Sequence, residues 1–365
     1  MKKPPTWDAS FFCLARCGTI RNDTKGIPNM IQVQNLSKIF RKPIRGKGLV
    51  GMLATLFSRK YTEIRAVDDV SFDIAEGEIV GYIGSNGAGK STTIKMMCGI
   101  LTPTSGKVLI DDKEPYLKRR IVAKDIGVVF GQKSQLWWDI PLIESFKVLK
   151  EVYQVSDSDY EERIAFLSSV LGIDEFMNQP VRTLSLGQRM RADLAASMLH
   201  NPKILFLDEP TIGMDVLVKD KIRTAIHALN AKYHTTVVLT THDMADIENL
   251  CSRIIMIEKG KIIYDGPLGD IKRRFGNIKT LTLTVPPNVD PNAVKPFSDE
   301  VTMTVDEDKV ILSFDADKAV LEQVIQYAFS QYHAIDMRIA DISIEDVVKK
   351  ILSQQEEEHA KAKKI

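Results

Sequence analysis

The chain has 365 residues, more than one ordinary domain requires, and 44% of them are hydrophobic, as in a packed globular protein. The formal net charge of +1 gives no whole-chain argument for binding to nucleic acid. No apolar run approaches the roughly 18 residues that a membrane span requires. We therefore expect two domains, and a role at a membrane would require a partner protein. The four cysteines have no spacing typical of a metal site, and their small number suits a reducing compartment: Cys13, Cys17, Cys98 and Cys251.

The N-terminal part shows two different patterns. Residues 1–29 have no periodicity, whereas Ile31-Gln32-Val33-Gln34 alternates as a strand does. We therefore expect residues 1–29 to form a disordered extension and the first folded domain to begin at Met30, which is also a candidate for the natural start of the protein.

Residues 84–92 carry the most specific motif of the chain, because they match G-x-x-x-x-G-K-[ST] at every fixed position. Residues 78–83 precede the motif as a buried strand would, and residues 93–98 follow it as a helix that ends at Gly99. Glycines let the N–H groups of such a loop point inward as a nest for phosphate oxygens, and the helix start adds its positive dipole end. A chance match of a glycine-rich turn is the alternative, and the flanking strand and helix argue against it. The residues expected to hold the phosphates of a nucleotide are Gly84, Ser85, Asn86, Gly87, Ala88, Gly89, Lys90, Ser91 and Thr92.

Strands and helices alternate around this loop. A pattern of this kind is typical of a mostly parallel, doubly wound sheet. One strand, residues 204–207, ends in Asp208 and Glu209, and a carboxylate presented at the end of an apolar strand can serve as a partner of Mg²⁺. Alone, this pattern also fits an ordinary strand followed by a charged turn. The expected strands lie at 66–74, 107–110, 126–130, 204–209 and 236–240, and the helical patterns at 141–172 and 186–200.

The composition changes after Phe275-Gly276. Residues 281–285, 301–305 and 310–314 alternate like strands with one exposed face, and residues 319–329 have an amphipathic helical pattern. We expect a small α+β accessory domain at 276–345 without a catalytic cluster. A charged C-terminal helix or tail is expected at 346–365.

Taken together, residues 31–275 resemble the ATP-binding subunit of an ABC transporter. The resemblance rests on six elements in the family's order, of which the phosphate loop is the first. It implies an α/β P-loop fold of the ABC ATPase type, with a mostly parallel core sheet, an antiparallel β region and a helical subdomain. The nucleotide-binding domain would occupy residues 30–275, and the helical subdomain with the signature motif residues 132–200. The other five elements are Gln132, the Leu184-Ser185-Leu186-Gly187-Gln188 signature segment, the Asp208-Glu209 pair, Asp215 and His242.

The resemblance also implies roles for individual residues. Glu209 would polarise the attacking water, His242 would contact the γ-phosphate, and Gln132 would sense both the γ-phosphate and the membrane partner. The implied catalytic residues are Glu209, His242, Gln132 and Lys90, the last of which would stabilise charge together with Mg²⁺. The implied metal ligands are Ser91, Gln132 and Asp208. The implied ATP contacts outside the phosphate loop are Phe40, Ser185, Gly187, Gln188 and Asp215.

Two positions depart from the family pattern. Leu186 stands where the signature usually has glycine, and a position that needs positive φ would strain a leucine. Phe40 stands where an aromatic ring usually stacks on adenine, but a long insertion separates it from Ala66. A core aromatic near the end of a strand is the alternative for Phe40.

In this family two nucleotide-binding domains pair head to tail, and each ATP lies between the phosphate loop of one and the signature of the other. The chain would therefore need a second copy of itself and a separate permease. It would lie at the cytoplasmic face of the plasma (inner) membrane, attached through the permease, and no nucleic acid is expected as a partner. The expected cofactors are ATP and Mg²⁺.

Three features suggest which branch of the family this is. Residues 211–215 and the C-terminal domain resemble ATPases of drug-export and other type-2 exporters, and the insertion at 41–64 resembles those of polysaccharide exporters. Export of a drug, peptide, lipid or glycan is the resulting hypothesis. A soluble ABC ATPase of the translation or DNA-repair type is one alternative, although such proteins usually carry two nucleotide-binding domains or long insertions. A non-hydrolysing binding module is another, and Glu209 argues against it.

The insertion at 41–64 has an apolar helical face between basic flanks. Such a helix suits contact with anionic lipid headgroups or with a permease helix. It equally suits burial against its own domain. The residues on the apolar face are Leu49, Met52, Leu53, Leu56 and Phe57.

Overall fold

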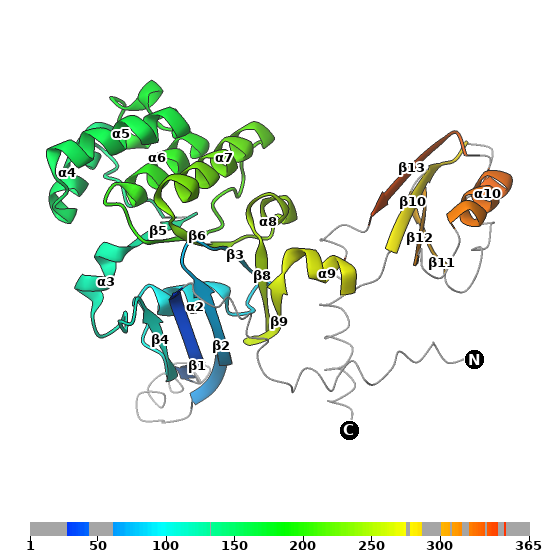
Figure 1. Cartoon of the computed structure of the whole chain (residues 1–365), viewed down its shortest axis with the longest axis horizontal. Helices are drawn as coiled ribbons and strands as arrows, with labels where there is room; N and C mark the ends of the chain where they lie inside the picture. The colour runs from blue at the N-terminus through cyan, green and yellow to red at the C-terminus, as the bar shows by residue number, and fades with distance from the viewer. Residues whose placement is uncertain are drawn as a thin grey trace, which may run out of the picture. The chain divides into compact units, whose positions relative to one another are not determined.

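The computed structural model forms two compact units, Met1–Gly266 and Pro267–Ile365 (Figure 1). The expected disordered extension, except its last two residues, and the apolar helix of the insertion lie outside the described residues. Within the described ranges, no helix has the length and apolarity needed to cross a membrane. The residues that the structure describes are 28–43, 61–131, 133–274, 278–286, 301–306, 309–315, 321–332, 334–341 and 347.

A six-stranded sheet organises the first unit, in the order β5-β6-β7-β3-β8-β9. The pairs β5·β6, β6·β7, β7·β3 and β3·β8 are parallel. Every residue of β3 and β7 is buried, as expected for strands covered on both faces. The mostly parallel core predicted from the sequence is therefore confirmed. The bounds are β3 Ile79–Ile83, β5 Ile126–Phe130, β6 Ile204–Asp208, β7 Thr236–Thr240, β8 Arg253–Glu258 and β9 Lys261–Pro267.

An antiparallel sheet of three strands, in the order β2-β1-β4, forms the second layer. Strand β2 pairs with β1 as far as its end, where Phe40 lies opposite Ile64 and Pro43 opposite Tyr61, whereas β4 pairs with β1 only as far as Ser37. Residues 41–43 and 61–64, the two ends of the expected insertion, thus continue a β-hairpin. The bounds are β1 Asn29–Pro43, β2 Tyr61–Ala75 and β4 Ser105–Ile110.

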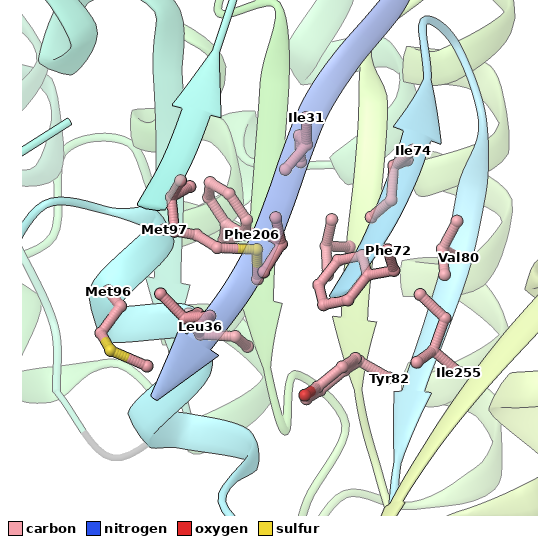
Figure 2. Close-up of a cluster of buried hydrophobic side chains, with 14 of the residues drawn as sticks. Ile31, Leu36, Phe72, Ile74, Val80, Tyr82, Met96, Met97, Phe206 and Ile255 are labelled. Carbon is pink, nitrogen blue, oxygen red and sulfur yellow. The ribbon is translucent and has the colours of Figure 1, made fainter. Parts of the chain in front are cut away.

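One apolar cluster joins the two sheets to helix α2 (Lys90–Met97), as Figure 2 shows. Phe72 of β2 meets Tyr82 of β3 with ring centroids 5.8 Å apart. The Tyr82 hydroxyl donates to Thr93 Oγ1 at 3.3 Å, so that this buried polar atom has a partner inside α2. Burial of an apolar side chain of this size stabilises the folded state by about 1.5–3 kcal/mol. The cluster therefore fixes α2, and with it the loop before α2, against both sheets.

A group of helices gathers at the other end of this unit from the antiparallel sheet (Figure 1). The helical pattern expected at 141–172 is two helices, because Gln154 ends α4 with left-handed backbone angles and Ser156 caps α5 by accepting from the Asp159 N–H. Helix α6 is buried from Met190 to Met198. The bounds are α3 Arg119–Asp125, α4 Leu142–Tyr153, α5 Asp157–Leu171, η3 Asp174–Phe176, η4 Val181–Thr183, α6 Leu186–Met198, α7 Val216–Tyr233 and α8 Met244–Leu250.

The second unit contains an antiparallel sheet in the order β11-β12-β10-β13. Helix α10 buries Val324 and Ala328 against alternate residues of the sheet such as Leu281 and Leu312. Strand β13, which pairs with β10, is an element that the sequence pattern did not predict. The bounds are α9 Leu268–Arg274, β10 Ile278–Thr284, β11 Val301–Asp306, β12 Lys309–Asp315, α10 Leu321–Tyr332 and β13 Asp336–Asp341.

Candidate active site

The phosphate loop joins the end of β3 to the start of α2. A Cβ on Gly84 would lie 2.0 Å from the carbonyl oxygen of Ile257, and one on Gly89, where φ is 115°, would lie 2.4 Å from that of Ala66. Neither position can therefore carry a side chain. Gly87 has a φ of 84° and nothing within 4 Å of a hypothetical Cβ, so it requires glycine for its backbone angle alone.

Lys90 is buried beneath this loop. Its Nζ donates to the carbonyl oxygens of Gly84 at 2.7 Å and Ser85 at 3.0 Å, which holds the ammonium across the loop. Burial lowers the pKa of Lys90, while the carboxylates of Glu209, Asp208 and Glu258 oppose that shift. The position thus combines a cation with the inward face of the loop, where a phosphate group would be attracted.

Asp208 lies at the end of β6, next to the phosphate loop. Its Oδ1 accepts a hydrogen bond from Thr240 Oγ1 at 2.6 Å and one from Ser91 Oγ at 3.4 Å. A carboxylate and a hydroxyl side by side are hard oxygen donors of the kind that Mg²⁺ prefers. Mg²⁺ is commonly held by one or two such groups together with the phosphates of a substrate, and this pair fits that pattern.

Glu209 follows Asp208 and adopts a left-handed conformation with a φ of 56°. Its N–H donates to the carbonyl oxygen of Thr240 at 2.9 Å, which holds the turn at the end of β7. His242 Nδ1 lies 2.7 Å from Glu209 Oε2. Because a carboxylate only accepts, the Nδ1–H of His242 is the donor. The turn thus brings together two side chains that are 33 residues apart in the sequence.

The signature segment begins α6. Ser185 caps the helix: its Oγ accepts from the Gln188 N–H at 3.2 Å, and its own N–H donates to Gln188 Oε1 at 2.9 Å. Leu186 is the first residue of α6 and does not have positive φ, so the strain expected for a leucine at this position is absent. A Cβ on Gly187 would lie 2.8 Å from Val218 Cγ1, which explains the glycine by close packing on α7.

Asp246 is a residue of this region that the sequence did not reveal. Its fully buried carboxylate accepts from the hydroxyls of Thr211 and Thr241, and Arg223 Nε donates to it at 2.7 Å. Thr211 follows Glu209 closely and Thr241 precedes His242. The carboxylate thus ties together the two loops that carry the Glu209–His242 pair. The only sequence signal that could have indicated it is its place four residues after His242.

The structure gathers some of the predicted site residues and separates others. Among the described residues, no hydrogen bond or ion pair joins the signature segment or Asp215 to the phosphate loop; Asp215 instead caps α7 by accepting from the Val218 N–H at 2.9 Å. Phe40 is a partly exposed residue of β1, with Lys38 Nζ 5.4 Å from its ring centroid. Gln132 lies outside the described residues. The residues that come together are Lys90, Ser91, Asp208, Glu209 and His242.

Comparison with known proteins gives consistent matches. Residues 67–212 match a family model described as ABC transporter. The probable multidrug ABC transporter ATP-binding protein YbhF of Escherichia coli (strain K12) is 37% identical over 223 residues, which are 60% of this chain and 38% of that protein. The chain therefore spans well under half the length of YbhF. The ABC transporter ATP-binding protein NatA of Bacillus subtilis (strain 168) is 33% identical over 212 residues, 58% of this chain and 86% of that protein.

Solved structures resemble the same part of the chain. The ATP-binding cassette MJ0796, a dimer in a post-hydrolysis state bound to ADP and Pi, is 27% identical with a TM-score of 0.55, covering 66% of this chain and 99% of that one. Two proteins named methionine import ATP-binding protein are also among the matches of the sequence. The similarity thus extends over the nucleotide-binding region in both sequence and fold.

Lys90 and Glu209 should fail in different ways when they are replaced. Lys90→Ala removes the cation from the phosphate loop and should lower nucleotide affinity, whereas Glu209→Gln keeps the loop intact and should lower turnover by roughly 10²-fold with little change in binding. Isothermal titration with ATP and a phosphate-release assay measure the two quantities. Lys95→Ala is the matched control, because it removes an exposed lysine from the same helix. Normal turnover by Glu209→Gln would show that Glu209 is not the general base.

Proposed function

The chain belongs to the ATP-binding proteins of ABC transporters, and on that premise we propose that it binds and hydrolyses ATP with Mg²⁺ to drive a separate membrane permease. The observation that carries the proposal is the convergence of Lys90, Asp208, Glu209 and His242 at the ends of β3, β6 and β7. The carboxyl ends of parallel strands are where such sheets bind ligands, and here they combine a phosphate cradle with a paired carboxylate and imidazole.

The residues divide the chemistry among them. The loop N–H groups and the start of α2 would bind the phosphates, and Lys90 would exchange its carbonyl partners for the β- and γ-phosphates. Ser91 and Asp208 would hold Mg²⁺, which supplies charge stabilisation to the phosphates when bound. Glu209 would accept a proton from the attacking water. His242 would orient Glu209 through Nδ1 and would contact the γ-phosphate.

A second copy of the chain would complete the site. Among the described residues, no hydrogen bond joins Ser185 or Gly187 to the phosphate loop of their own chain, which favours a phosphate held by another copy as the partner of this signature. Apolar side chains are exposed beside the signature: Val216 and Leu217 are 71% and 76% exposed, and Leu186 and Ile212 are exposed as well. Exposed apolar residues in one patch favour an interface. The similarity to the MJ0796 dimer supports the same arrangement.

The dimer should depend on ATP and on this apolar patch. Glu209→Gln with saturating ATP should sediment as a dimer, because hydrolysis no longer releases the two copies, and Leu217→Ser in the same background should shift it toward monomer. Leu117→Ser, which changes an equally exposed leucine elsewhere, is the control. Monomers of the Glu209→Gln chain at saturating ATP would contradict the proposed pairing.

The surface after Gln132 is the proposed contact with the permease. Trp137 and Trp138 are 44% and 48% exposed, and two adjacent exposed tryptophans are unusual on a surface that contacts only water. Asp139 beside them is paired with Arg182 at 3.0 Å. Aromatic side chains are typical of the centre of an interface, and polar or charged side chains of its rim.

Replacing either tryptophan should uncouple the chain from its permease. Trp137→Ala and Trp138→Ala should reduce co-purification with the permease from detergent-solubilised membranes by roughly tenfold or more, as expected for anchor residues, and leave ATP binding unchanged. Val152→Ala removes an exposed apolar residue of α4 and serves as the control. Unchanged co-purification and transport in both tryptophan variants would refute this contact.

Export is the direction that we favour for transport. The similarity to a protein named as a probable multidrug transporter supports it, together with residues 211–215 and the additional α+β unit. The proposed cargo is a drug, peptide, lipid or glycan, and the chain would act at the cytoplasmic face of the membrane through its permease. Transport of labelled candidates into or out of vesicles that contain the complex tests the direction.

A further inference from the structure

Asp193 is a buried carboxylate that the nucleotide site does not use. It lies two turns into α6 and is only 6% exposed. Its Oδ1 accepts from Ser134 Oγ at 2.9 Å and from the Gln135 N–H at 3.1 Å. In return, Gln135 Nε2 donates to the Asp193 carbonyl oxygen at 3.2 Å. Three hydrogen bonds thus join one residue of α6 to the segment that follows Gln132.

Folding stability does not explain a carboxylate at this position. Burial raises the pKa of Asp193 to about 6, although Ser134, Gln135 and the charge of Arg189 oppose the shift. Because the pKa is raised in the folded state, the stability linked to this proton is present below about pH 4 and is lost as the pH rises through about 6. At neutral pH the burial of the ionised group therefore costs folding free energy that its hydrogen bonds offset only in part, so the choice of a carboxylate at this position calls for another explanation.

Arg189 makes a second connection between the same helix and the same segment. Its guanidinium lies over the ring of Trp138, 4.5 Å from the centroid. It also donates to the carbonyl oxygen of Leu184 at 3.3 Å, next to the signature serine. Arg189 and Asp193 are four residues apart and therefore lie on one face of α6. That face of α6 is attached to residues 134–138 at two points, through the hydrogen bonds of Asp193 and through the contact of Arg189 with the Trp138 ring.

We propose that Asp193 and Arg189 are positioning residues that fasten the Trp137–Trp138 surface to α6, so that the surface moves with the signature end of this helix when nucleotide is bound. The proposal rests on the proposed function, because it requires nucleotide to engage Ser185 at the helix start. Helix α6 is capped and largely buried, and it therefore moves as one body. A displacement at its first turn reaches Ser134 and Trp138 through the hydrogen bonds and the ring contact described above.

The three tryptophans of the chain permit a direct test on the full-length protein. With Trp7→Phe and Trp137→Phe, Trp138 is the only tryptophan. We expect Mg²⁺ and a non-hydrolysable ATP analogue to change the iodide quenching of Trp138 fluorescence at concentrations where the chain pairs. Asp193→Leu, similar in size but without an acceptor, should reduce this change about tenfold, the effect of losing a charge-assisted hydrogen bond. The affinity for the analogue should stay the same.

Three further variants separate positioning from structural support. Asp193→Asn keeps an acceptor oxygen and should retain the response. Ser197→Ala removes a buried hydroxyl one turn further along α6 and should also retain the response, because this hydroxyl donates to the Leu194 carbonyl oxygen of its own helix at 2.8 Å. Ser134→Ala removes the hydroxyl that donates to Asp193 and should lose the response. This variant tests the proposal in place of Asp193→Leu if the latter does not fold.

The outcomes that overturn the proposal are distinct from failure of the proposed function. A parent chain that binds the analogue without any change at Trp138 overturns it, as does a normal response in both Asp193→Leu and Ser134→Ala. Equal loss in Ser197→Ala would also overturn it, because the effect would then belong to the helix as a whole. Failure of the parent to bind the analogue would instead refute the proposed function.

Discussion

The left-handed turn at Glu209 is the constraint on which the site depends. A non-glycine residue in this conformation costs roughly 1–2 kcal/mol, and the surrounding hydrogen bonds must offset it. They come from both neighbouring strands: the Glu209 N–H donates to Thr240, and the Gly131 N–H donates to the Asp208 carbonyl oxygen at 2.8 Å. A Cβ on Gly131 would lie 2.6 Å from the Glu209 carbonyl oxygen, so the turn also requires a glycine on β5's side.

The turn decides where two successive carboxylates point. Asp208 ends β6 and faces Ser91 and Thr240, whereas Glu209 turns toward His242. In a regular strand, adjacent side chains lie on opposite faces of the sheet, and the left-handed conformation of Glu209 breaks this alternation. The parallel register of β3, β6 and β7 then brings the phosphate loop beside both. One strained residue thus gives two neighbouring acids different partners, Ser91 and Thr240 for Asp208 and His242 for Glu209, as the proposed roles of metal ligand and base require.

The sequence predicted the family and the fold class correctly, because the phosphate loop, the acidic strand end and the signature are local patterns. It could not predict interactions that depend on distant segments coming together. Ser134 and Asp193 are 59 residues apart, and neither belongs to a motif. In the sequence, Asp246 looks like any acidic residue of a helix. Its role becomes visible only in the structure, where the hydroxyls of Thr211 and Thr241 donate to its carboxylate. Leu186 is not strained, because this position begins a helix and does not need the positive φ on which the expected strain depended. Strand β13 was missed because the alternation in Asp336–Asp341 extends over only four residues, Asp336 to Ile339.

The central claim is that Glu209 and His242 act as a unit, and a double-mutant cycle on kcat tests it most directly. Glu209→Gln, His242→Ala and the double variant would be compared with the unchanged chain under saturating ATP and Mg²⁺. If His242 works through Glu209, the double variant should lose no more than Glu209→Gln alone, roughly 10²-fold. Losses that multiply, so that the double variant is slower than Glu209→Gln by the full factor of His242→Ala, would show that the two residues act independently and would contradict this account.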